Sequence, residues 1–162
     1  MTATTRIDRF REIARQIGHD FEGQILVGGN YAPAVVHGGQ LHISGQVPRV
    51  GTALVATGRA GATLTLDQTQ AAARVCAMRT LGLALQALGS LERVARVLKI
   101  NVYVQCAPDF TQISEVADAA SEVLHTVLGE AGVHARTSVG VYQLPKDAPV
   151  EIDLVAALDN GD

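Results

Sequence analysis

The sequence predicts one α+β domain, built from a mixed β-sheet with two long helices packed on one of its faces. Two segments repeat apolar residues at helical spacing: one starts at Thr65 or Asp67 and runs to Leu88, and the other opens at Pro108 and Asp109. Shorter strand-like segments precede, separate and follow them. The resulting order, β-β-α-β-α-β-β, combines β-α-β connections with antiparallel hairpins at both ends, which requires a mixed sheet.

The composition is that of a globular protein with an aliphatic core. Hydrophobic residues make up 48% of the 162 residues and charged residues 18%, whereas aromatic residues make up only 4%. Such a chain can bury one compact core, mostly of Ala, Val, Leu and Ile. The net charge is −3 and no block of like charges occurs. This balance argues against a nucleic-acid-binding surface.

Targeting and redox patterns point to the cytoplasm. The N-terminal residues lack the apolar region of a secretory signal, and no apolar run reaches the roughly 18 residues of a membrane span. Cys76 and Cys106 lie in neither a CxxC nor a Cys/His metal spacing, so we expect reduced thiols and no metal site.

The first third of the chain is expected to hold a helix and a hairpin. Thr5 can cap a helix that runs through about Gln16, so residues 1–20 form a helical extension of the single domain 1–162. The short apolar runs 34–37 and 41–44 flank two glycines, a pattern typical of a β-hairpin.

The remaining strands are expected at about 94–104, 136–143 and 150–158. In the first of these, alternation places Leu98, Ile100, Val102 and Val104 on one face. We expect the apolar faces to lie under the helices. The polar residues then point away from the helices; they are His42, Ser44, Asn101, Arg136, Ser138, Glu151 and Asp153.

A guanidinium and a carboxylate are thus expected to meet on neighbouring strands. Arg136 can bind a carboxylate ligand through two parallel hydrogen bonds. Glu151 can then polarise a water molecule. Two simpler interpretations stay open: a polar sheet face that is only hydrated, and an Arg136–Glu151 salt bridge without any ligand.

The C-terminal motifs resemble those of the RidA/YjgF family. They read His134-Ala135-Arg136-Thr137-Ser138-Val139-Gly140-Val141, then Leu144-Pro145, then Val150-Glu151-Ile152-Asp153. Asn30-Tyr31 and Ser44-Gly45-Gln46-Val47-Pro48 match the family's N-terminal motifs. The resemblance extends from about Gly28 to Ala156, and it is greatest to a longer branch labelled endoribonuclease L-PSP or translation inhibitor.

This resemblance implies a chorismate-mutase-like fold and a homotrimer with pockets between subunits. It also implies hydrolysis of 2-imino or 2-enamino acids to 2-oxo acids and ammonia, without a metal or organic cofactor. Arg136 would bind the substrate carboxylate and Glu151 would orient the attacking water. The backbone of Ser138 would help to position that water, and Tyr31 and Ser44 would line the pocket.

Two positions depart from the family pattern. Ser138 stands where the active branch commonly has Cys, and Asp118 (or Ser114, in a second helix alignment) stands where Asn is usual. These changes favour an alternative function, a non-catalytic binder of a small carboxylate in the same pocket. An endoribonuclease is disfavoured, because the chain is acidic and no histidine pair is expected.

Overall fold

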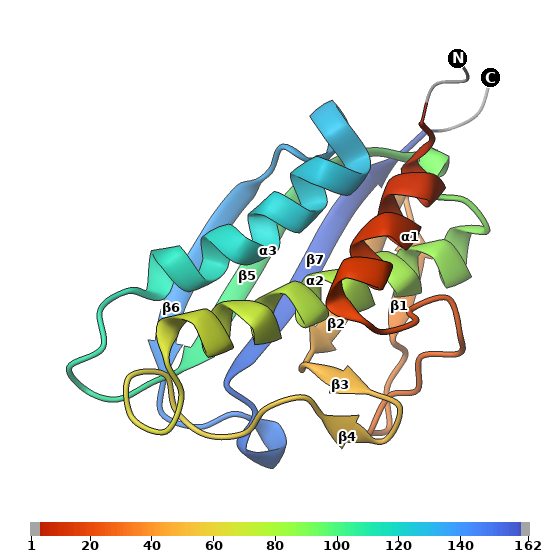
Figure 1. Ribbon diagram of the computed structural model, residues 1–162. Helices are drawn as coiled ribbons and strands as arrows, with labels where there is room; N and C mark the ends of the chain where they lie inside the picture. The colour runs from red at the N-terminus through yellow and green to blue at the C-terminus, as the bar shows by residue number, and fades with distance from the viewer. Residues whose placement is uncertain (1–3, 160–162) are drawn as a thin grey trace.

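The computed structural model describes residues 4–159. They form three α-helices, a five-stranded sheet and a small two-stranded sheet (Figure 1). The elements are α1 (Arg6–Ile17), β1 (Ala34–His37), β2 (Gln40–Gln46), β3 (Arg49–Val50), β4 (Ala53–Leu54), α2 (Leu66–Leu88), η1 (Leu91–Arg93), β5 (Val94–Gln105), α3 (Ile113–Leu128), η2 (Gly129–Gly132), β6 (Ala135–Val141), η3 (Pro145–Asp147) and β7 (Val150–Leu158). The predicted α+β class is confirmed.

The five-stranded sheet is mixed, with the strand order β1-β2-β7-β5-β6. β7 lies antiparallel between β2 and β5, whereas β6 lies parallel to β5 at the edge. The prediction that the last two strands pair as a hairpin is therefore wrong. The β5-α3-β6 unit is a crossover that leaves β6 beside β5. The chain then returns to the space between β2 and β5, where both edges of β7 find hydrogen-bonding partners.

Helices α2 and α3 cover one face of this sheet, and α1 lies outside them (Figure 1). The core between helices and sheet is aliphatic, with Leu81, Leu124 and Ile152 almost fully buried. Phe10 anchors α1 to this core with no exposed surface. No helix within residues 4–159 combines the length and apolar character that crossing a membrane requires.

A helix begins at the residue that the sequence predicts where a side chain caps its first turn. Thr5 and Thr65 each form a capping box, so α1 and α2 begin where the sequence predicts. The third helix starts at Ile113, not at Pro108 and Asp109. The backbone of the preceding segment is used elsewhere, because the N–H of Ala107 donates to the carbonyl of Ala60.

Strand β5 follows the predicted alternation except at one residue. Ile100, Val102 and Val104 are buried under the helices, as expected. Leu98 is instead 37% exposed, because the pairing register of β5 and β7 shifts between Val97 and Lys99. A bulge of this kind moves one side chain to the other face.

The sheet face away from the helices is uncovered in the single chain. It carries apolar side chains that are 40–50% exposed at Val35 and Val139. The half-buried residues Tyr103, Asp153 and Val155 lie between them. A face of this mixed character suits a partner surface better than bulk water.

Candidate functional site

Arg136 lies on the helix-covered side of the edge strand β6. It is paired with Ile100, whose side chain is in the core, and its guanidinium reaches α3. Its Nη1 donates to Oδ1 of Asp118 at 2.8 Å and to Oγ of Ser121 at 3.0 Å. Its Nη2 donates to the carbonyl oxygen of Ser114 at 3.5 Å.

The predicted orientation of Arg136 and Ser138 is therefore wrong. Alternation along β6 predicts that its apolar residues face the helices. At this edge, however, Val139 points to the open face, where it is 40% exposed, and Ser138 pairs with the core residue Val102. Apolar side chains mark the buried face of a central strand, but they are a weaker guide in an edge strand such as β6.

A chain of hydrogen bonds through His134 and Ser121 supports the guanidinium of Arg136. Nδ1 of His134 lies 2.6 Å from the carbonyl oxygen of Gly132, so this nitrogen carries the proton. Nε2 of His134 then accepts from Ser121 at 2.9 Å, and Ser121 accepts from Arg136. Burial lowers the pKa of His134, in agreement with this neutral ring.

The expectation that no two histidines come together is also wrong. The ring centroids of His125 and His134 lie 5.3 Å apart. Both nitrogens of His134 are already hydrogen-bonded, so the ring orients its neighbours and has no free nitrogen for acid–base chemistry. Within residues 4–159, no three His, Cys, Asp or Glu side chains gather as a metal centre requires.

Glu151 lies on the other side of the sheet, in a separate cavity of about 220 Å³. The carboxylate is half-buried and lies directly against Gly45, where an added Cβ would collide with Oε1. Burial, and next to it the charge of Asp153, raises the pKa of Glu151 above its usual range. The cavity is lined by Leu26, Val27, Gly28, Tyr31, Gly45, Gln46, Val47, Arg49, Arg79, Pro145, Lys146 and Glu151.

Of the predicted pocket residues, Tyr31 is brought to Glu151 but Ser44 is not among the lining residues. The hydroxyl of Ser44 donates to the carbonyl of Pro33 at 3.1 Å, so it fixes the loop that carries Tyr31. The reasoning from sequence missed Arg79 and Lys146. The signal for Arg79 was a single charged residue in the mostly apolar run Ala77-Met78-Arg79-Thr80-Leu81.

Arg136 and Glu151 do not meet within one chain. Strand β5 lies between β6 and β7, and the two side chains point to opposite faces of the sheet. We call the two groups the arginine half-site (Arg136, Ser138, Asp118, Ser121) and the glutamate half-site (the residues that line the Glu151 cavity). Each half-site lies at the surface of the single chain.

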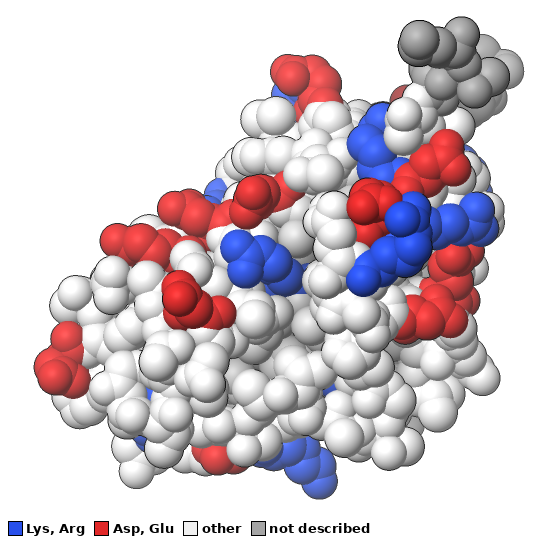
Figure 2. Space-filling view, in the orientation of Figure 1, with Lys and Arg blue, Asp and Glu red and all other residues white. Residues whose placement is uncertain are grey.

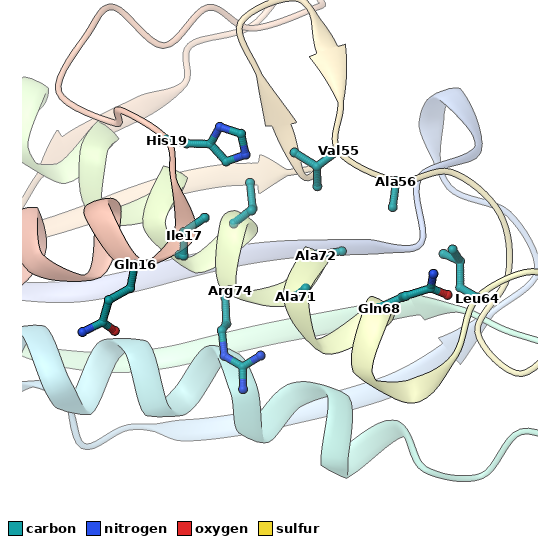
Figure 3. A pocket seen from close by; sticks show the side chains of 11 residues that line it. Gln16, Ile17, His19, Val55, Ala56, Leu64, Gln68, Ala71, Ala72 and Arg74 are labelled. Carbon is teal, nitrogen blue, oxygen red and sulfur yellow. The ribbon is translucent and has the colours of Figure 1, made fainter.

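Another hollow, of about 460 Å³, lies on the helix-covered side (Figure 3). Side chains from the end of α1, from α2 and from the segment 55–64 surround it. Polar atoms at its rim come from Gln16, His19, Gln68 and Arg74. It contains neither Arg136 nor Glu151, and it is distinct from both half-sites.

Fold and site together define a small α+β protein that presents two polar half-sites on opposite faces of one sheet. A family model described as endoribonuclease L-PSP matches residues 22–158. The chain therefore belongs to this family, to which the YjgF proteins are structurally related, and the resemblance found in the sequence is confirmed. Helix α1 lies outside the matched residues.

Three relatives illustrate this membership. Protein TCP17 of Trypanosoma cruzi is 48% identical over 132 residues, which cover 81% of this chain and 82% of that protein. The crystal structure of Atu1372 from Agrobacterium tumefaciens, described as a protein of unknown function, has a TM-score of 0.84 at 35% identity, with 95% of each chain covered. The YjgF gene product of E. coli has a TM-score of 0.61 at 25% identity, with 86% of this chain and 95% of that chain covered.

Proposed function

We propose that the protein hydrolyses reactive 2-imino or 2-enamino acids to 2-oxo acids and ammonia, in a pocket that two subunits of a homotrimer complete together. The observation that carries this proposal is the separation of the half-sites. One chain holds the carboxylate-binding arginine and the proton-accepting glutamate on opposite faces of its sheet. A neighbouring copy can bring the two groups to one substrate.

The uncovered sheet face supports such an assembly. Val35, Leu98 and Val139 are each more than a third exposed there, and within residues 4–159 no strand pairs with the outer edge of β6. Exposed apolar groups on a sheet face are stabilised when another surface covers them. A cyclic assembly of identical copies provides that cover and repeats the same contact at every interface.

Arg136 is suited to bind the carboxylate of the substrate. Its present partner Asp118 has a side chain that is 67% exposed, and so the ion pair between them adds little stability. A substrate carboxylate that forms two parallel hydrogen bonds can replace it. The side chain of Arg136 is itself only 22% exposed, so its direction is already set.

Glu151 is suited to accept a proton from water. The water oxygen adds to C2 of the imine while one water proton passes through Glu151 to the nitrogen, which gives a carbinolamine. The proton of the new C2 hydroxyl then moves to the nitrogen as the C–N bond breaks and the C2 carbonyl forms. Imino acid and water thus yield 2-oxo acid and ammonia, with no oxidant or cofactor. A raised pKa brings the carboxyl group closer to neutral pH, where a general base works best. In this proposal Ser138 helps to position the water, and Tyr31 lines the pocket.

The same geometry also suits a non-catalytic binder of small carboxylates, since Asp118 competes with any anion for Arg136. RNA cleavage, which the family description suggests, is less well supported. Among the described residues, the face in Figure 2 shows acidic side chains along α3, mixed charges over α1 and no extended basic area. A basic area is what RNA binding usually requires.

The test uses 2-iminobutanoate generated in situ from the amino acid by an amino-acid oxidase. We expect ammonia release faster than the spontaneous rate, a large loss in Arg136→Ala, and no change in the matched surface variant Arg15→Gln. The side chain of Arg15 is 71% exposed on α1, away from both half-sites. Release at only the spontaneous rate, together with thermal stabilisation by 2-oxobutanoate, would identify a binder instead.

Mixing inactive variants tests where the pocket lies. If Arg136 and Glu151 act across a subunit boundary, random co-assembly of Arg136→Ala and Glu151→Gln chains restores about one quarter of the wild-type activity. Each variant alone stays inactive. A mixture that remains inactive, although native mass spectrometry shows mixed trimers, contradicts the intersubunit pocket.

A further inference from the structure

Three cationic side chains line the glutamate half-site beside a single carboxylate. They are Arg49, Arg79 and Lys146, and Glu151 is the acidic residue of that lining. Among the described residues, no acidic side chain forms an ion pair with any of the three. An excess of unpaired positive charge in a small cavity attracts anions.

Arg79 has the least ordinary environment of the three. It lies in the apolar part of α2 and is only 6% exposed. Its Nε donates to Oε1 of Gln46 at 3.2 Å, and its Nη1 donates to the carbonyl oxygen of Arg49 at 2.7 Å. Burial lowers its pKa. The described hydrogen-bond acceptors of this guanidinium are neutral, so its positive charge is not compensated. Burying such a charge costs free energy, and an anion in the pocket would offset that cost.

Lys146 is held at the cavity by a strained turn. Lys146 and Asp147 both have positive φ values, 60° and 59°, which are unfavourable for residues other than glycine. The fully buried side chain of Gln105 stabilises this turn from both sides. Its Nε2 donates to Oδ1 of Asp147 at 2.6 Å, and its Oε1 accepts from the N–H of Leu144 at 2.8 Å.

Arg49, on β3, is the third cationic residue of the cavity; we call Arg49, Arg79 and Lys146 the cationic wall. Its guanidinium lies beside the backbone of Gly28, since a Cβ added there would be 3.5 Å from both terminal nitrogens. The cationic wall therefore has three origins in the fold: a helix, a short strand and a strained turn. Separate elements that converge on one cavity are typical of a ligand site.

We propose that this cationic wall binds a second anionic group of the substrate, so that the favoured substrates are 2-imino dicarboxylic acids of four or five carbons. The inference rests on the proposed function and names its substrate class. The carboxylate next to the imine binds Arg136 of a neighbouring subunit, and the side-chain carboxylate binds Arg79, Arg49 and Lys146. The cavity of about 220 Å³ has room for one short side chain.

The reaction is the one already described, with an unchanged side-chain carboxylate. Water adds at C2 and both of its protons reach the nitrogen in turn, so ammonia leaves and a 2-oxo dicarboxylate remains. Because the product carries the same two anionic groups, product binding can be measured separately from turnover.

The experiment compares binding of 2-oxoglutarate and oxaloacetate with binding of 2-oxobutanoate by calorimetry on the intact wild-type protein. We expect the dicarboxylates to bind at least about tenfold more tightly at low ionic strength, and the advantage to shrink as salt is added. Inorganic phosphate at equal ionic strength controls for unspecific anion binding. Equal affinities for the two classes of oxo acid, or equally tight binding of phosphate, would overturn the inference.

Variants identify the wall itself. Lys146→Asn removes a charge but keeps a residue that tolerates positive φ, and Arg49→Gln removes a charge from a partly exposed position. Each should bring the ratio of the two affinities closer to one, whereas Arg15→Gln, which changes the net charge equally, should leave the ratio as it is. Arg79→Gln should abolish the preference, with its fold checked by circular dichroism. An unchanged ratio in both Lys146→Asn and Arg49→Gln contradicts the proposal.

The two proposals fail in different ways. Preferential binding of dicarboxylates without any turnover would refute the hydrolase and leave the cationic wall in place. Turnover of 2-iminobutanoate without a preference for dicarboxylates would refute only the cationic wall.

Discussion

The arginine and glutamate half-sites differ in the ion pairing and burial of their charged side chains. Arg136 is paired with a well-exposed carboxylate at the sheet edge, and we propose that it exchanges this partner for a ligand. Glu151 is half-buried beside cations with which it forms no ion pair, and burial raises its pKa. In our proposal the arginine half-site therefore binds the carboxylate next to the imine, and Glu151 carries out the proton transfer.

The largest expected effect comes from a substitution at Glu151 that should remove proton transfer and leave anion binding intact. Glu151→Gln keeps the shape of the side chain but removes the proton acceptor, so kcat for imine hydrolysis should fall by about a thousandfold. Affinity for a 2-oxo acid should stay within about threefold of wild type, because Arg136 is intact. Steady-state kinetics and calorimetry measure the two quantities. A variant that loses binding and keeps kcat would reverse the roles of the half-sites.

A smaller loss is expected when Glu151 is displaced but not replaced. Gly45 lies at the register shift of β2 against β7, and a Cβ there collides with Oε1 of Glu151. Gly45→Ala should lower kcat by about a hundredfold, since misplacing a catalytic group by about 1 Å has an effect of that size. Gly38→Ala is a poor control because Gly38 has positive φ, whereas Gly23→Ala meets open space and should be silent. Full activity in Gly45→Ala would show that the position of Glu151 is unimportant.

Acidity should act on the glutamate half-site through the carboxyl group of Glu151. The folded protein binds the proton of Glu151 more tightly than the unfolded chain, so activity falls about tenfold per pH unit below the raised pKa. Stability changes with pH in the opposite direction to activity. As the pH rises from the usual value of 4.5 through the raised pKa, the wild type loses stability relative to Glu151→Gln. Melting temperatures of both proteins between pH 4 and pH 8 test this, and parallel curves would contradict it.

The smallest expected effect comes from a substitution at Ser121, which supports the guanidinium of Arg136. Ser121→Ala removes the hydroxyl that joins His134 to Arg136, so the guanidinium is held less firmly. Affinity for 2-oxobutanoate should fall by about threefold, while kcat for the bound imino acid should hardly change. The rescue variant Ser121→Thr keeps a hydroxyl and should recover most of the affinity. A loss of kcat without a loss of affinity would place Ser121 in the chemistry itself.

Much of the fold could be predicted from local patterns. Thr5 and Thr65 each have a side chain that bonds the first turn of a helix, so the starts of α1 and α2 follow from a few neighbouring residues. The start of α3 was misplaced because the backbone at Ala107 bonds to Ala60, far away in the sequence. Strand β7 was misplaced for a similar reason, since its partners β2 and β5 are chosen by the whole sheet.

The sequence by itself determined the residue types at the site and their order along the chain. It also determined the alternation of β7 that sets Glu151 opposite the core, since a period of two depends only on the extended backbone. Only the tertiary structure decided that Arg136 turns toward Asp118, that Glu151 lies two strands away, and that Arg79 and Lys146 join its cavity. Strand order and burial depend on which surfaces the entire chain can cover at once, and no local pattern contains that information.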